Sequence, residues 1–110
     1  MSYDCYMEID TGGKHRATVC DIGNMTSNVS GMWAKALGFP LAEMEGWTGE
    51  KVGTHVRRAC AAIANPDTRH EYEAMNPSNG WGSVQSAENY LHAILKGCNL
   101  HPKATLRISR

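Results

Sequence analysis

The sequence predicts an α+β fold, in which a small antiparallel sheet of about three strands is covered on one face by three to four helices. Two observations lead to this prediction. Apolar and polar residues alternate near both ends of the chain, at 3–9 and 104–108, as in half-buried strands. Between these ends the apolar residues recur at helical spacing. Two strands near the N-terminus, helices in the middle and one strand near the C-terminus are typical of two packed layers.

The first two strands should form a hairpin. Residues 3–9 place an apolar side chain at every second position, and the Thr-Gly-Gly-Lys sequence at 11–14 has the composition of a tight turn. Residues 17–22 are rich in β-branched side chains, so we expect them to return antiparallel to the first strand.

The middle of the chain predicts four helices. Residues that favour helix starts, such as Thr26, Asn28 and Ser83, precede apolar residues spaced three to four apart. Gly38 and Gly97 are expected to end the first and last helices. The predicted spans run from Thr26 or Asn28 to Leu37, over 50–64, from Pro66 to about Met75, and from Ser83 to Gly97; residues 41–49 are compatible with a further short turn of helix.

The length and charge of the chain indicate which classes of partner to expect. A chain of 110 residues is expected to form one domain, 1–110, which buries enough apolar surface to fold without metals or disulfides. Eleven basic and eleven acidic residues cancel and neither sign forms a run, so we expect no nucleic-acid partner and no membrane partner. A net charge of zero removes the repulsion that keeps copies apart, which permits a homo-oligomer.

The N-terminal residues and the cysteines indicate a cytoplasmic protein. The chain begins without a basic region followed by an apolar run, and no apolar stretch approaches the length of a membrane span. Four cysteines are spread along the chain without a Cys-x-x-Cys pair, which favours reduced thiols over a metal site. We therefore expect neither a metal ion nor a cofactor.

Two polar stretches, at 24–28 and at 76–82, predict a binding site, because each precedes a predicted helix. The unpaired N–H groups at a helix start carry partial positive charge and bind anions or polar groups. A purely structural alternative is that these residues are helix caps and an Asx turn with a buried tryptophan. The predicted ligand-binding residues are Asn24, Thr26, Asn28, Asn76, Asn79 and Trp81.

If the two stretches converge, their side chains suit a base, or a sugar with a phosphate. Their amides offer hydrogen-bond donors and acceptors, and Trp81 or Trp33 can stack on a planar ring. Lys14, His15 and Arg16, in and beside the predicted hairpin turn, are possible anion contacts. The sequence contains no GxGxxG or GxxxxGK motif, which argues against classical dinucleotide or triphosphate binding.

The residues suggest no catalytic group. The five histidines are scattered, no pair of carboxylates is spaced for acid–base work, and no Ser or Cys stands in a nucleophile elbow. We therefore assign no catalytic residue.

Several motifs resemble those of one protein family. They are Asn-Met-Thr-Ser-Asn-Val at 24–29, Ala36-Leu37, Asn-Pro-Ser-Asn-Gly-Trp-Gly at 76–82, Cys98, His101-Pro102-Lys103-Ala104 and Ile108-Ser109-Arg110. The chain resembles, over nearly its whole length, a group of small proteins encoded by bacteriophages, especially those of actinobacteria, and by bacterial mobile elements. This group has no established activity, so the resemblance implies no catalytic residue. Its members often have His between the Thr and Asn of the first motif, where this chain has Ser27.

Binding groups without catalytic groups predict a non-catalytic protein. The phage resemblance suggests an anti-defence role, in which the protein sequesters a nucleotide-derived immune signal in the cytoplasm of the infected host. One alternative is an inhibitor that binds a host protein through a patch of Trp33, Trp47 and Trp81. Another is a small nucleotide-processing enzyme with His15 or His70 as the acid–base residue.

Overall fold

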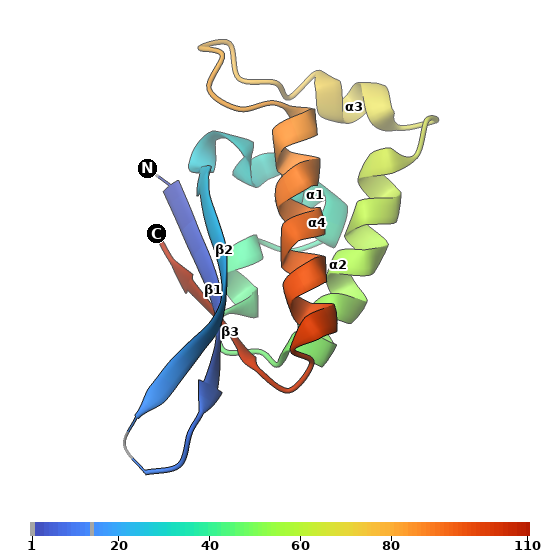
Figure 1. Ribbon diagram of the computed structural model, residues 1–110. Coiled ribbons are helices and arrows are strands. Elements are labelled where there is room, and N and C mark those ends of the chain that lie inside the picture. Colours follow the sequence, from blue (N-terminus) through green and yellow to red (C-terminus); the bar gives the residue numbers. More distant parts are fainter. Residues whose placement is uncertain (1, 14) are drawn as a thin grey trace.

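The structure is a computed structural model that describes residues 2–13 and 15–110 (Figure 1). It contains a three-stranded antiparallel sheet with the strand order β2-β1-β3. The strands are β1 (Ser2–Asp10), β2 (Arg16–Thr26) and β3 (Thr105–Ser109). The helices are α1 (Ser30–Leu37), α2 (Gly49–Ala64), α3 (Arg69–Glu73) and α4 (Val84–Leu100), with 3-10 turns η1 (Ser27–Val29) and η2 (Leu41–Met44).

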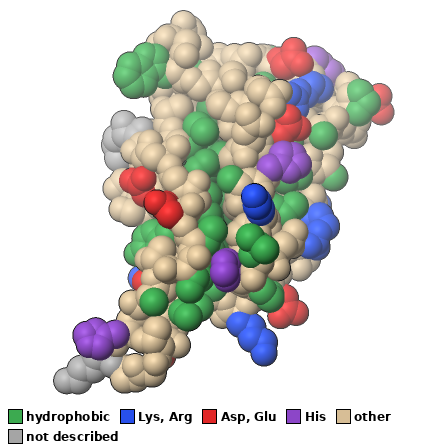
Figure 2. All heavy atoms as spheres, in the orientation of Figure 1, with side chains coloured by type: hydrophobic (Ala, Val, Ile, Leu, Met, Phe, Trp, Pro, Cys, Tyr) green, Lys and Arg blue, Asp and Glu red, His purple; other side chains and the backbone are tan. Residues whose placement is uncertain are grey.

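The helices lie on one face of the sheet, which confirms the predicted α+β fold (Figure 1). On β1, Tyr3, Cys5 and Met7 are buried against the helices, as the alternation predicts. Hydrophobic side chains remain visible along the boundary between β2 and α4 (Figure 2). Ile22 and Leu95 are among the side chains that pack against the core while staying partly buried. In the described part of the chain, no helix is long and apolar enough to cross a lipid bilayer.

The second strand continues beyond its predicted end, as far as Thr26. Asn24 pairs with Asp4 and Thr26 pairs with Ser2, so pairing with β1 holds both residues in the sheet. Gly23, with a φ of +103°, lies beside one of two register shifts in this pair of strands. Asn24 and Thr26 therefore lie at the end of a strand, and the predicted end of this strand at residue 22 is wrong.

The last helix passes through Gly97 and ends at Leu100. Gly97 is buried, and a Cβ atom there would lie 3.4 Å from Cys20 Sγ and 3.6 Å from Met7 Cγ. The glycine therefore allows α4 to pack closely on the sheet, and the prediction that it ends the helix is wrong.

The third helix is shorter than predicted and spans Arg69–Glu73. Pro66 lies in a turn before it. The side-chain oxygen of Asn65 accepts a hydrogen bond from the N–H of Asp67 at 3.0 Å, which forms an Asx turn. The predicted start of this helix at Pro66 is therefore wrong.

Buried thiols should make the fold sensitive to alkaline pH. Burial raises the pKa of Cys5 and that of Cys98 from an ordinary value of 9.0 to about 11. A thiol whose pKa is higher in the folded chain stabilises the fold below pH 9 and loses this contribution as the pH rises through 11. We expect the free energy of unfolding, measured by urea denaturation, to fall between about pH 9 and 11 by about 1 to 2 kcal/mol for each of the two thiols.

The control for this prediction is the variant Cys98→Ala. Because it removes one of the two thiols, its unfolding free energy should fall less steeply over the same pH range. An equally steep fall in the variant would show that other groups dominate the alkaline transition.

Candidate functional site

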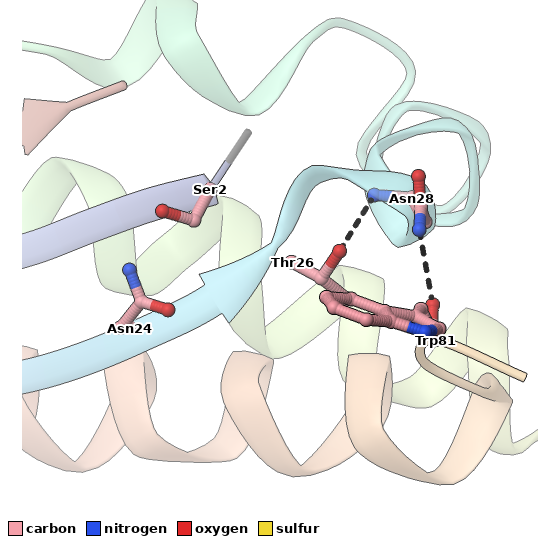
Figure 3. Close-up of a pocket in the computed structure, with 5 residues that line it drawn as sticks. All are labelled: Ser2, Asn24, Thr26, Asn28 and Trp81. Carbon is pink, nitrogen blue, oxygen red and sulfur yellow. Dashed lines mark hydrogen bonds between the residues drawn. The ribbon is translucent and has the colours of Figure 1, made fainter.

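One end of the sheet carries a pocket of about 480 Å³. Its lining consists of Ser2 from β1, Asn24 and Thr26 from β2, Asn28 from η1 and Trp81 from the loop before α4 (Figure 3). The structure thus brings together the three predicted residues of the first polar stretch and the tryptophan of the second.

The turn from β2 into η1 fixes the positions of Thr26 and Asn28. Thr26 is the N-cap of the 3-10 turn η1, and its side-chain oxygen accepts a hydrogen bond from the backbone N–H of Asn28 at 3.4 Å; α1 itself begins at Ser30, later than the predicted start at Thr26 or Asn28. The side-chain amide of Asn28 donates to the carbonyl oxygen of Trp81, also at 3.4 Å. This bond joins the two polar stretches, whose bonded residues are 53 positions apart in the sequence.

The second polar stretch uses its amides to shape its own loop. The Oδ1 atom of Asn79 accepts a hydrogen bond from the N–H of Trp81 at 2.9 Å, which is an Asx turn. The Oδ1 atom of Asn76 accepts from the N–H of Val84, at the start of α4, at 3.0 Å. Neither asparagine lines the pocket. Asn76 and Asn79 therefore stabilise the loop and the start of α4, which is the structural alternative to ligand binding given for these residues.

Gly82 lets this loop lie directly against the end of β2. Its φ is +99°, and a Cβ atom at this position would lie 2.7 Å from Val29 Cγ1 and 3.0 Å from Thr26 Cγ2. Both the backbone conformation and the available space therefore require glycine. Ser83 follows at once and caps α4 in a capping box with Ser86.

Hydrogen bonds fix which end of each pocket amide is free. The Nδ2 atom of Asn24 donates to the carboxylate of Asp4 at 3.0 Å, as that of Asn28 does to the carbonyl of Trp81. A carboxylate and a carbonyl oxygen only accept, so each amide must turn its nitrogen to these partners. In Figure 3 the oxygen of Asn24 points towards Thr26 and Trp81, while its nitrogen points towards β1. The pocket therefore meets Asn24 as a hydrogen-bond acceptor.

Ser2 and Asp4 belong to this site although the sequence does not single them out. Ser2 lies opposite Thr26, and Asp4 lies opposite Asn24, in the pairing of β1 with β2. The register of β1 against β2 would identify these two residues as the partners of Thr26 and Asn24. It cannot be obtained by counting residues from the hairpin turn, because the pairing contains two register shifts.

The tryptophans differ strongly in exposure. The side chain of Trp81 is 69% exposed, whereas that of Trp33 is 0% exposed and packs between Tyr3 and Tyr90. Trp33 therefore cannot stack on a ligand. For the same reason the predicted exposed patch of Trp33, Trp47 and Trp81 does not exist as one surface.

The predicted anion contacts lie at the other end of the hairpin. Lys14 is outside the described residues, His15 is exposed, and Arg16 forms an ion pair with Glu8. Arg16 and Thr26 are the two ends of β2, whose 11 residues extend over about 30 Å. The structure therefore does not bring His15 or Arg16 to the pocket.

The described lining of the pocket is uncharged. It contains two hydroxyls, two amides and an indole, and neither His15 nor His70 is part of it. Within residues 2–13 and 15–110, no group of three or more His, Cys, Asp or Glu side chains could hold a metal ion.

Comparisons with family models, with characterised proteins and with solved structures find no match to this chain.

Proposed function

We propose that this chain is a non-catalytic phage protein that binds and sequesters a small polar ligand with a planar ring. We further propose that the ligand is a nucleotide-derived signal of host defence, captured in the cytoplasm of the infected cell. The resemblance of the two Asn-rich motifs to phage proteins supports the biological setting, and the pocket supports ligand binding.

One observation carries this proposal, which is the convergence of the first polar stretch and the exposed indole of Trp81 on one pocket. Its volume of about 480 Å³ is within the range typical of small-ligand sites. An indole that is 69% exposed offers a face on which a planar ring can stack. The surrounding hydroxyls and amides can then select the ring by hydrogen bonds.

The lining favours binding over turnover. General acid–base catalysis needs a titratable group within hydrogen-bond reach of the reacting atom. The hydroxyls of Ser2 and Thr26 have no neighbouring base in the described lining, which consists otherwise of Asn24, Asn28 and Trp81. The enzyme alternative with His15 or His70 finds no support at this pocket.

The variant Trp81→Ala tests the proposal. It should weaken the binding of a nucleoside or nucleotide by about five- to a hundredfold, because stacking of a base on an aromatic side chain contributes about 1 to 3 kcal/mol. Its melting temperature should stay within about 2 °C of the wild type, because the indole is 69% exposed. Isothermal titration and thermal unfolding measure the two quantities.

The matched control is Leu100→Ala, which truncates an apolar side chain that is 63% exposed and does not line the pocket. It should change neither affinity nor melting temperature appreciably. Wild-type affinity in Trp81→Ala would refute the proposed role of the pocket.

A second surface favours the alternative of an inhibitor that binds a host protein. Phe39, Trp47 and His55 are only partly buried, and their rings lie within 5.7 Å of one another between centroids. The ammonium of Lys51 lies 3.9 Å from the centre of the Trp47 ring. Partly exposed tryptophans such as Trp47 are typical of interface hot spots. A protein that acts through this cluster would keep its biological effect in the Trp81→Ala variant.

A further inference from the structure

We infer that the pocket recognises the amino-bearing edge of an uncharged planar heterocycle, such as an aminated nucleobase, and gains no affinity from phosphate. This inference rests on the proposed function and specifies its ligand. It differs from what the sequence alone suggests, since helix starts and a basic hairpin turn favour a phosphorylated ligand.

Two free polar atoms of the pocket amides are acceptors, the Oδ1 atoms of Asn24 and Asn28. Each amide donates one of its two N–H groups, to Asp4 and to the carbonyl oxygen of Trp81, and the described residues donate no hydrogen bond to either Oδ1 atom. A ligand pairs with an amide oxygen only by donating an N–H or O–H group. Phosphate oxygens at neutral pH are acceptors, so they do not satisfy these atoms. An exocyclic amino group does.

The charges near the pocket also disfavour a phosphate group. The described lining contains no Lys or Arg, and the carboxylate of Asp4 lies one hydrogen bond behind Asn24. Arg16, one of the predicted anion contacts, is at the far end of β2 and is paired with Glu8. A phosphate placed here would be repelled by Asp4, and the described lining offers no cation to compensate.

The start of α4 does not supply an anion site either. The N–H of Val84 is bonded to Asn76, and the N–H of Ser86 is bonded to Ser83. Side chains of this chain therefore already satisfy part of the helix start that would otherwise attract a phosphate.

The remaining groups suit a neutral ring. The Trp81 indole offers a stacking face, and base–aromatic stacking does not require charge. The hydroxyls of Ser2 and Thr26 can each donate or accept, so they adapt to the other polar atoms of the ring.

Matched ligands test this inference. Adenosine, cytidine and guanosine are titrated calorimetrically into the wild-type protein, each beside its 5′-monophosphate and its analogue without the exocyclic amino group. For the tightest nucleoside, removal of the amino group should weaken binding by about fivefold, the effect of one hydrogen bond. Its monophosphate should bind less than threefold more tightly than the nucleoside itself.

The outcomes separate this inference from the proposed function. A monophosphate that binds threefold or more tightly, or an analogue without the amino group that binds as well as the nucleoside, overturns the inference and leaves a ligand-binding pocket in place. No binding by any member of the panel contradicts the proposed function, and the inference falls with it.

The variant Asp4→Asn isolates the contribution of charge. It keeps an oxygen that can accept from Asn24 but removes the negative charge next to the pocket. The ratio of monophosphate affinity to nucleoside affinity should rise about threefold at low salt, as expected for one charge interacting across a partly solvated site. An unchanged ratio at low salt would overturn the proposed effect of Asp4 on phosphate.

Discussion

Replacing Trp33 by alanine is expected to lower the free energy of unfolding by about 3 to 5 kcal/mol, the usual effect of truncating a fully buried tryptophan. The indole is 0% exposed, packs 5.3 Å from Tyr3 and 5.4 Å from Tyr90 between ring centroids, and donates from Nε1 to the carbonyl oxygen of Ala87 at 3.1 Å. Trp33→Ala removes both the packing and the hydrogen bond. The melting temperature should fall by about 15 °C or more in a domain of this size.

The control is Trp33→Phe, which keeps an aromatic ring in the core but removes the indole N–H. It should lose part of the packing and leave the carbonyl of Ala87 without the bond from Nε1. Its stability should therefore lie between that of the wild type and that of Trp33→Ala. A melting temperature of Trp33→Ala within a few degrees of the wild type would show that this part of the core is not closely packed.

Replacing Gly82 by alanine is expected to destabilise the fold by about 2 to 4 kcal/mol, because it combines backbone strain with overpacking. The φ of +99° disfavours any residue with a Cβ atom, and that atom would lie 2.7 Å from Val29 Cγ1 and 3.0 Å from Thr26 Cγ2. To relieve these contacts the loop must move away from β2, which displaces Trp81. Nucleoside affinity and melting temperature should both decrease, as calorimetry and thermal unfolding would show.

Gly80→Ala is the matched control for Gly82→Ala. Gly80 also has a positive φ, +75°, but a Cβ atom there meets nothing within 4 Å. This variant should lose only about 1 kcal/mol, from backbone strain alone. If the two variants melt at the same temperature, a Cβ atom at position 82 does not clash with Val29 and Thr26 as the geometry requires.

Much of the fold could be predicted because the local patterns agree with the final packing. Alternation on β1 matches its buried residues, and Thr26 caps η1 as its position suggests. The errors occur where distant contacts override a local preference. Asn24 favours a turn, but pairing with Asp4 keeps it in a strand, and Gly97 favours a helix end, but its close packing on the sheet keeps it helical.

The candidate site could be predicted only in part, for a related reason. The sequence identifies both polar stretches, but it cannot show which amides are already bonded within the chain. Asn76 and Asn79 accept hydrogen bonds from the backbone of Val84 and Trp81, whereas the described residues donate none to the Oδ1 atom of Asn24. Nor can it separate Trp33 from Trp81, since burial depends on tertiary packing.

The hydrogen bond between Asn28 and Trp81 has a consequence for the stage of folding at which the pocket forms. It closes a loop of 53 positions, and the other walls of the pocket come from the paired ends of β1 and β2. Contacts this distant in sequence form only after the intervening chain has lost most of its freedom. A partly folded chain therefore has no binding pocket. Ligand binding draws only on the native population and stabilises it by mass action.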